Sequence, residues 1–233
     1  MDARDRLIVA LDVPTLAEAR ALVERLGDAA SFYKIGLELV MGGGLELARE
    51  LTGRGKRVFL DMKLLDIGHT MERATRAAAA TGATLLTVHG QDLKTLRAAI
   101  AGRAGTALKI LGVTVLTNLD EEDLRQQGID DTPEGLVARR ARLAREAGCE
   151  GVVASGREAR SLRAILGEAM LIVAPGVRLT SDLTGDQVRT TTPEEAIAAG
   201  ADHLVVGRPI IGAADPGAAL DAFVRAIERA SAR

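Results

Sequence analysis

The sequence is poor in cysteine and in aromatic side chains. Its 233 residues include one cysteine, Cys149, no tryptophan, one tyrosine and three phenylalanines. A lone cysteine cannot form an internal disulfide, which is typical of proteins from a reducing compartment. Because 47% of the residues are nevertheless hydrophobic, the core must be built from Ala, Val, Leu and Ile.

Long apolar runs and a charge excess are also missing. No hydrophobic run reaches the ~18 residues that cross a membrane, and the N-terminal MDARDRLIVALD is charged from the start, with no secretory pattern. Thirty basic and 32 acidic residues give a net charge of −2, which excludes a nucleic-acid footprint or a membrane-surface patch. We therefore expect a cytoplasmic globular protein that binds neither nucleic acid nor membrane.

Lysine is scarce among the basic residues, since twenty-five of the thirty are arginine. A surface charge can be either residue, whereas a proton donor cannot be arginine, because its guanidinium keeps its proton in ordinary protein environments. Each lysine in this arginine-rich chain is therefore a candidate for chemistry. The five are Lys34, Lys56, Lys63, Lys94 and Lys109.

Short β-rich apolar runs alternate with longer segments of helical period. The expected strands are 7–12, 31–37, 57–62, 84–89, 108–114, 150–154, 171–174 and 203–207. The expected helices are about 15–26, 43–54, 68–81, 92–101, 133–147, 157–166, 193–199 and 216–230. Thr15 and Thr192 have the spacing of helix N-caps, and glycines such as Gly148 stand where helices should stop.

Eight strands alternating with eight helices predict parallel pairing. The length is close to the roughly 250 residues of a (β/α)8 barrel, so we expect an α/β protein with a parallel eight-stranded TIM barrel as a single domain over 1–233. An open doubly wound sheet is the alternative, but no G-x-G-x-x-G follows the first strand. The one stretch without clear structure is 176–191, whose length indicates a functional loop.

Charged residues stand where the first three expected strands end, and a barrel places its active site at those ends. Asp12 follows the first strand, Lys34 lies on the second, and Asp61 and Lys63 follow the third. Residues two apart on a strand face the same way. In isolation the run D-x-K-x-x-D, which ends at Asp66, is more often a surface salt-bridge cluster. Its place on a barrel rim beside Lys34 and Asp12 favours a catalytic site in which alternating charges keep one another ionised.

A second group of residues has the character of a phosphate site. Late loops of barrels often bind phosphate through backbone N–H groups at a helix N-terminus. Gly207 and Arg208 follow the last expected strand directly, and glycine lets an anion approach the backbone while arginine offers a planar fork. Arg178 and Gln187, in the long loop after the seventh strand, are placed to close over the same anion.

The three histidines do not indicate a metal site. His69 and His203 have no acidic or cysteine partners at metal-ligand spacing. His89, at a strand end, is more often a packed residue than a catalyst, and the sequence does not settle whether His89 or Ser155 contacts a ligand. Cys149 has no nearby histidine and is expected to be structural.

At these positions the sequence resembles the orotidine 5′-phosphate decarboxylases of the bacterial type, over essentially the whole chain. The resemblance rests on short motifs: LDV with Asp12, YKIG with Lys34, DMKLLDIGHT from Asp61 to Thr70, VTVLT ending at Thr117, APGVR with Arg178, GDQ-x-R with Gln187, and VVGRPI with Gly207 and Arg208. Gly68 and His69 stand where many members have Pro-Asn, at positions that do not carry the charge chemistry.

The resemblance implies decarboxylation of orotidine 5′-monophosphate to uridine 5′-monophosphate, the last step of pyrimidine nucleotide synthesis, without metal or organic cofactor. It implies a homodimer with active sites at the interface, in which Asp66 and Thr70 reach into the partner's site. Lys63 would protonate carbon 6 within a catalytic set of Asp61, Lys63, Asp66 and Lys34. Substrate would be bound by Asp12, Lys34, Asp61, Ile67, Thr70, Thr117, Arg178, Gln187, Gly207 and Arg208.

Two other functions compete with this one. Hexulose-phosphate synthases and ketogulonate-phosphate decarboxylases share a barrel with D-x-K-x-x-D but use a divalent metal and an enediolate. Ile67, Thr70 and the Gln187 loop favour the orotidine enzyme. A catalytically silent barrel that binds a nucleotide is the second alternative, and the complete charged set argues against it.

Overall fold

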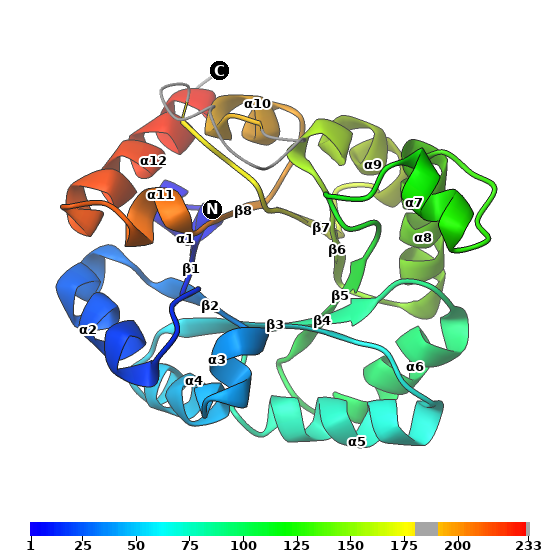
Figure 1. The fold of residues 1–233 in the computed structure, drawn as a ribbon, viewed down its shortest axis with the longest axis horizontal. Helices are drawn as coiled ribbons and strands as arrows, with labels where there is room; N and C mark the ends of the chain where they lie inside the picture. The colour runs from blue at the N-terminus through cyan, green and yellow to red at the C-terminus, as the bar shows by residue number, and fades with distance from the viewer. Residues whose placement is uncertain (180–190, 232–233) are drawn as a thin grey trace.

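A computed structural model of the protein describes residues 1–179 and 191–231 as a closed barrel of eight parallel strands (Figure 1). Each strand pairs with the next along the chain, and β8 pairs with β1 to close the sheet, which confirms the barrel and excludes the open sheet. The strands are β1 (Leu7–Ala10), β2 (Phe32–Gly36), β3 (Arg57–Leu64), β4 (Leu85–His89), β5 (Lys109–Val113), β6 (Gly151–Val153), β7 (Leu171–Ala174) and β8 (His203–Val206).

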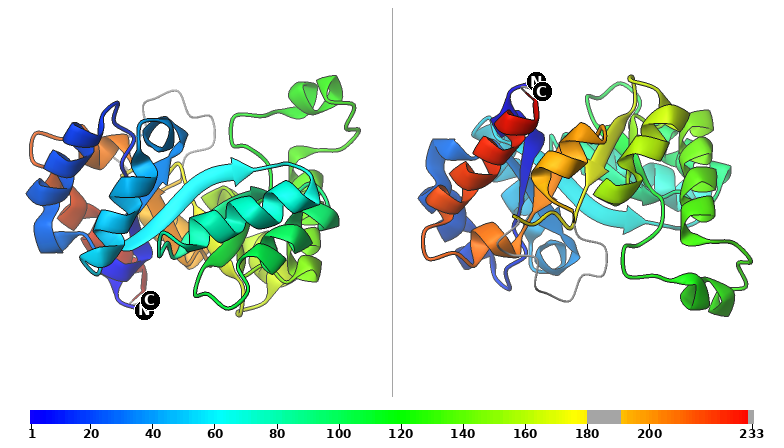
Figure 2. Two further views of the ribbon diagram at one scale, coloured as in Figure 1. Left: turned by 90° about the horizontal axis from the view of Figure 1, so that it is seen from below. Right: turned by 90° about the horizontal axis from the view of Figure 1, so that it is seen from above.

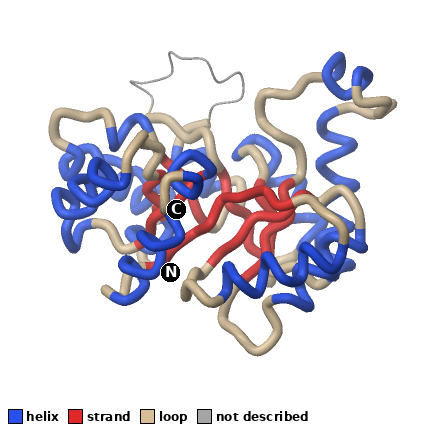
Figure 3. The backbone as a smooth tube through the Cα atoms, turned by 60° about the horizontal axis from the view of Figure 1, so that its bottom comes forward, coloured by secondary structure: helices blue, strands red, loops and turns tan. Residues whose placement is uncertain are grey.

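All eight expected helices are present and surround the sheet (Figure 3). They are α2 (Leu16–Leu26), α4 (Gly44–Gly53), α5 (Gly68–Ala79), α6 (Leu93–Gly102), α8 (Pro133–Ala147), α9 (Ala159–Leu166), α10 (Pro193–Ala198) and α12 (Pro216–Ser231). The predicted caps are confirmed, since the side chains of Thr15 and Thr192 accept hydrogen bonds from the backbone N–H of Glu18 and Glu195. Gly148 ends α8 with a φ of 85°, a conformation that disfavours other residues.

The short elements were not predicted. They are α1 (Ala3–Arg6), α3 (Leu37–Met41), α7 (Glu121–Gln126), α11 (Arg208–Ile211) and the 3-10 turns η1 (Gly27–Ala29) and η2 (Gly156–Glu158). Each is at most six residues long and shows little helical period in the sequence. The equally short α10 was predicted from its N-cap at Thr192 instead. No helix of the described segments is long and apolar enough to cross a membrane.

The expectation of a single irregular stretch at 176–191 was wrong. The chain between β5 and α8 also leaves the barrel, and Figure 2 shows α7 standing away from it. Asp120 caps α7 in a reciprocal capping box with Asp123. After β7, the backbone N–H of Arg178 donates to the Thr191 carbonyl at 3.0 Å, so the described ends of the β7–α10 connection lie side by side.

The hydrophobic core has two layers, one on each face of the sheet. The larger layer lies between strands and helices and consists mainly of Ala, Val, Leu and Ile, as the composition requires. The smaller layer fills the barrel interior with alternate residues of the strands: Ile8, Ala10, Phe32, Phe59, Leu85, Leu111, Val173 and Val205. The barrel is therefore packed from inside, and its next inward-facing layer, toward the carboxyl ends, is where polar side chains begin.

At the amino ends of the strands, His203 is buried as a neutral ring. Its Nδ1 lies 3.1 Å from the Asp5 carbonyl oxygen, and its ring meets the Phe32 ring edge-on at 5.6 Å. The Arg57 guanidinium stacks on Phe32 at 4.5 Å. Burial, with a contribution from Arg57, lowers the pKa of His203 to about 4.

This burial predicts a pH-dependent stability. The unfolded histidine takes up a proton near pH 6.5 and the folded one only near pH 4, so the unfolded state binds more protons between these values. The contribution of His203 to the free energy of unfolding is therefore present above pH 6.5 and is lost as the pH drops. The loss is about 2 kcal/mol between pH 7.5 and 5. Urea unfolding at both pH values should show a smaller loss for His203→Gln than for the wild type.

His69→Gln is the matched control, because His69 is exposed and should leave the pH dependence unchanged. An equal loss of stability in the wild type and in His203→Gln would contradict the assignment of this titration to His203.

Candidate active site

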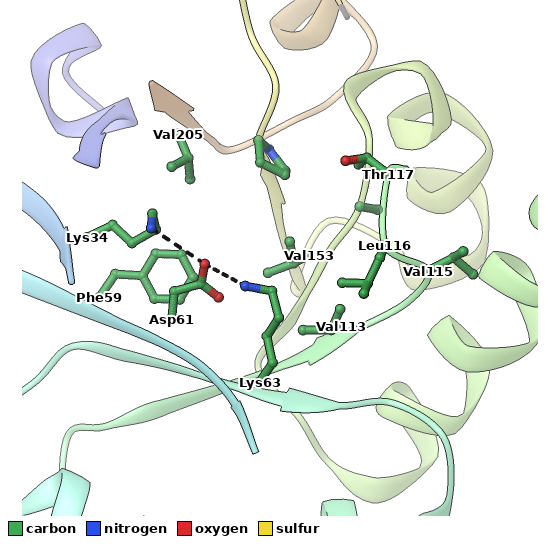
Figure 4. Close-up of a pocket in the computed structure, with 12 residues that line it drawn as sticks. Lys34, Phe59, Asp61, Lys63, Val113, Val115, Leu116, Thr117, Val153 and Val205 are labelled. Atoms are coloured by element: carbon green, nitrogen blue, oxygen red, sulfur yellow. Dashed lines mark hydrogen bonds and ion pairs between the residues drawn. The ribbon is translucent and has the colours of Figure 1, made fainter. Parts of the chain in front are cut away.

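Four charged side chains from three neighbouring strands form one network at the carboxyl ends of the barrel. Lys63 Nζ donates to Asp61 Oδ2 at 2.8 Å, and Lys34 Nζ lies 3.7 Å from the same oxygen. Lys34 Nζ also donates to Asp12 Oδ1 at 2.8 Å. Figure 4 shows the two ammonium groups on either side of the Asp61 carboxylate. The structure thus brings Asp12, Lys34, Asp61 and Lys63 together as predicted.

Strand register explains how Lys34 and Asp61 meet. Lys34 is paired with Phe59 across β2 and β3, and Asp61 lies two residues further along β3. Side chains two apart point to the same face of a strand, so both polar groups stand above the Phe32 and Phe59 rings of the inner core. Their side chains are only 9% and 15% exposed, and at such burial each charge needs its partners.

Lys63 reaches the site through a distortion of β3. The strand continues to Leu64, but its pairing with β4 shifts between Leu60 and Leu64. Within the described part of the chain, Lys63 is the one non-glycine residue with a positive φ, 47°. Such a conformation costs about 1–3 kcal/mol and persists where surrounding contacts enforce it. The expected common orientation of Asp61 and Lys63 is confirmed, although a bulge rather than a regular pleat produces it.

The network borders two adjoining cavities that share Lys34, Asp61 and Lys63. The first, of about 300 Å³, is also lined by Asp12, Gly176, Arg178, Gly207 and Arg208. The second, of about 180 Å³, is largely apolar (Figure 4) and is also lined by Phe59, Val113, Thr117, Val153 and Val205. The site therefore has a polar end with two arginines and an apolar end, with the lysines where they join.

The predicted phosphate residues lie at the polar end. Gly207 follows β8 and precedes the one-turn helix α11. Its backbone lies close to Asp12, since a Cβ added at Gly207 would be 3.6 Å from Asp12 Oδ2. Arg178 and Arg208 line the same cavity, and their guanidinium groups suit phosphate oxygens. Gln187 lies outside the described residues.

Three predicted residues do not reach this chain's own network. Asp66, Ile67 and Thr70 are exposed, and the Ile67 side chain stands out at 73% exposure. Asp66 and Ile67 line a separate open depression together with Asp92, Lys94 and Thr95. This surface position is the one required if these residues serve a neighbouring subunit.

His89, Ser155 and Cys149 are not among the residues that line the two cavities. The pKa of His89 is lowered by burial and by the nearby charges of Arg140 and Lys63. Ser155 is buried and caps η2 by accepting from the Arg157 N–H. Cys149 is a free, buried thiol packed in the outer core, and burial raises its pKa to about 12.

Sequence reasoning missed Thr87 and the apolar wall of Val113, Val153 and Val205. Thr87 is completely buried on β4 and donates from Oγ1 to Asp61 Oδ1 at 2.9 Å. The two-residue period of the strands was a signal for all four, because it marks alternate positions of each strand as facing inward. On β4 these positions are Leu85, Thr87 and His89.

The described residues do not gather three or more His, Cys, Asp or Glu side chains in a group able to hold a metal ion. Asp12 and Asp61, the two carboxylates of the network, both lie against the Lys34 ammonium, at 2.8 Å and 3.7 Å. The fold and this site define the class: a (β/α)8 barrel with an alternating Asp–Lys network and an arginine-lined cavity at the carboxyl ends of its strands.

Comparison with known proteins places the chain within this class. Residues 5–223 match the family described as Orotidine 5'-phosphate decarboxylase / HUMPS family. The orotidine 5'-phosphate decarboxylase of Rhodopseudomonas palustris (strain BisA53) is 52% identical over 224 residues, covering 96% of this chain and 95% of that protein. That of Methylobacterium radiotolerans is 53% identical over 223 residues, 96% of each chain. The chain belongs to the orotidine 5′-phosphate decarboxylase / HUMPS family.

A solved structure agrees with the sequence relatives. The crystal structure of orotidine 5'-phosphate decarboxylase from Lactobacillus acidophilus superposes with a TM-score of 0.85 at 32% sequence identity, covering 95% of this chain and 98% of that one. The barrel and the family predicted from the sequence are both confirmed.

The shared carboxylate generates a stability prediction. Asp61→Asn removes the anion between Lys34 and Lys63 and leaves two cations near each other in a partly buried site. We expect unfolding in urea to become easier by about 1–3 kcal/mol. Asp28→Asn is the matched control, because Asp28 also pairs with a lysine, Lys56, but its side chain is fully exposed.

The control should change the free energy of unfolding by less than about 0.5 kcal/mol. If Asp61→Asn were as stable as the wild type, the network would not contribute to holding this end of the barrel.

Proposed function

We propose that the protein decarboxylates orotidine 5′-monophosphate to uridine 5′-monophosphate. The observation that carries the proposal is the position of the Lys63 ammonium, 2.8 Å from Asp61 and shared by the apolar and the arginine-lined cavities. A nucleoside monophosphate matches these two cavities, because it has a flat base at one end and a phosphate dianion at the other. Curated relatives at 52–53% identity bear the name of this enzyme.

The two cavities support one orientation of the substrate in this proposal. The phosphate binds at the backbone of Gly207 with Arg178 and Arg208, and Gln187 completes this group. Lys34 lines both cavities and Asp12 lines the arginine-lined one, and both bind ribose hydroxyls. The pyrimidine enters the apolar cavity beside Thr117. Binding energy from the remote phosphate can then be used to stabilise the transition state.

Lys63 and Asp61 act on the reacting carbon. The bond between carbon 6 and its carboxylate breaks, carbon dioxide leaves, and the electron pair remains on carbon 6. The Lys63 ammonium stabilises this carbanion by its charge and then transfers a proton to it. Asp61 lies near the departing carboxylate, and two such charges about 4 Å apart repel by about 4 kcal/mol at an effective dielectric of 20. The neutral lysine regains its proton from water.

We propose that the working unit is a cytoplasmic homodimer of single-domain chains, each spanning 1–233. Asp66, Ile67 and Thr70 then complete the partner's site, and Asp66 supports the charge of the partner's lysine. The exposed apolar side chains support this assembly, because Leu65 and Ile67 on the β3–α5 connection and Leu37 and Met41 on α3 are 48–83% exposed. A subunit interface would remove these apolar side chains from water.

We propose a reaction without metal or organic cofactor. The metal-dependent members of the wider family need a divalent ion among carboxylates, whereas here an ammonium group, Lys34 Nζ, lies 2.8 Å from Asp12 and 3.7 Å from Asp61. The complete network also favours catalysis over a silent nucleotide-binding barrel, because binding alone does not need a strained lysine aimed into the site.

The test is the loss of ultraviolet absorbance of orotidine 5′-monophosphate on adding enzyme, with and without a chelator. The wild type should be equally active in both. Lys63→Ala should lose at least about a thousandfold in kcat while still binding uridine 5′-monophosphate in calorimetry.

Lys109→Ala is the control, because Lys109 is exposed at the amino end of β5 and should leave turnover unchanged. Activity lost to the chelator would favour the metal-dependent chemistry. Nucleotide binding by a wild type that releases no carbon dioxide would favour the silent barrel.

A shared site makes a separate prediction. Asp66→Asn and Lys63→Ala should each be inactive alone. A mixed dimer has one site with both altered residues and one with neither, so subunit exchange should restore up to about a quarter of wild-type activity per chain for a random mixture. Mixing Lys63→Ala with Asp61→Asn should restore none, since both residues belong to the same chain's network, and recovery in that control would contradict the proposed division.

A further inference from the structure

Thr87 forms hydrogen bonds with both Asp61 and Lys63 of β3. Its hydroxyl oxygen lies 2.9 Å from Asp61 Oδ1 and 2.9 Å from the backbone nitrogen of Lys63. The residue is on β4 at 0% exposure and appears in no motif of the sequence. One buried hydroxyl therefore contacts the Asp61 carboxylate and the backbone of Lys63, the two residues to which the proposed chemistry is assigned.

The direction of both hydrogen bonds is fixed by their partners. The backbone N–H of Lys63 can only donate, so Thr87 Oγ1 accepts from it. The single proton of the hydroxyl is then donated to Asp61 Oδ1. This leaves Asp61 Oδ2 for the two ammonium groups, with Lys63 Nζ at 2.8 Å and Lys34 Nζ at 3.7 Å. Thr87 thus sets which carboxylate oxygen faces the lysines.

The second hydrogen bond falls within the bulge. The pairing of β3 with β4 shifts between Leu60 and Leu64, and Lys63 adopts a φ of 47° there. At this point a side chain, not a carbonyl of β4, accepts the Lys63 N–H. A buried N–H without an acceptor is costly, so the hydroxyl helps to hold the conformation that directs Lys63 into the site.

We propose that Thr87 is a positioning residue for the decarboxylation: it orients the Asp61 carboxylate and holds the bulged backbone of Lys63, without contacting the nucleotide. The inference rests on the proposed function. It predicts a loss in turnover rather than in binding, because Thr87 is not among the residues that line either cavity.

Other buried threonines show that burial alone does not imply this role. Thr75 on α5 is also 0% exposed, and its hydroxyl has no hydrogen-bond partner in the structure. Thr114 donates to the Val153 carbonyl oxygen at 3.0 Å, a bond that only links neighbouring strands. Thr75 therefore offers a control in which the same atoms are removed at the same burial, away from the charged network.

The experiment compares Thr87→Val, Thr87→Ser and Thr75→Val with the wild type. Thr87→Val keeps the shape and removes the hydroxyl, so kcat should fall about tenfold to a hundredfold, the effect of losing a hydrogen bond to a charged group. Its KM should stay within about twofold of wild type. Thr87→Ser retains the hydroxyl and should recover most of kcat, and Thr75→Val should equal the wild type.

Calorimetry with uridine 5′-monophosphate separates positioning from misfolding. If Thr87→Val binds one nucleotide per chain with unchanged affinity, its lost turnover belongs to correctly folded sites. Should Thr87→Val not fold, Thr87→Ala is measured in the same way. Wild-type kcat in the hydroxyl-free variant, an equal loss in Thr87→Ser, or a rise in KM that accounts for the loss would each refute the inference while the wild type remains active. An inactive wild type would instead refute the proposed function, and this inference with it.

Discussion

The structure of the site depends on one shared carboxylate. Asp61 Oδ2 is 2.8 Å from Lys63 Nζ and 3.7 Å from Lys34 Nζ, so one anion holds two cations that would otherwise repel each other. Asp12 satisfies Lys34 from the other side. The alternation of sign lets four charges converge in a partly buried place, since each is compensated by its neighbours. Everything else in this end of the barrel positions or uses that arrangement.

The apolar barrel supports this network and defines its chemistry. Phe32 and Phe59 fill the interior layer directly beneath Lys34 and Asp61, which fixes the strands on which the charges stand. Above them the site divides into an apolar cavity and an arginine-lined one. This division suits a reaction in which a flat base is transformed in a dry environment while a remote phosphate supplies binding energy.

The site also has a conformational cost. Lys63 is held at a φ of 47° in a bulge of β3, although a regular strand would be less strained. Strain of this kind is tolerated where it places a functional group, and the hydroxyl of Thr87 stabilises it from the neighbouring strand. The unusual backbone and the functional lysine thus have one explanation.

The sequence by itself determined the barrel, its eight strands and eight long helices, the family, and the strand-end residues Asp12, Lys34, Asp61 and Lys63. These follow from periodicity and from local motifs, which a chain carries in its order. Only the tertiary structure decided the bulge at Lys63, the hydrogen bonds of Thr87 to Asp61 and Lys63, and the short helix α7. Register shifts and contacts between strands depend on how distant segments pair. The six residues of α7 are too few to show a clear period, whereas the equally short α10 was predicted from its N-cap at Thr192. The charged run from Asp61 to Asp66 illustrates both contributions. The sequence identified its charged residues. Only the fold showed that Asp61 and Lys63 line the cavity whereas Asp66 lies on the surface.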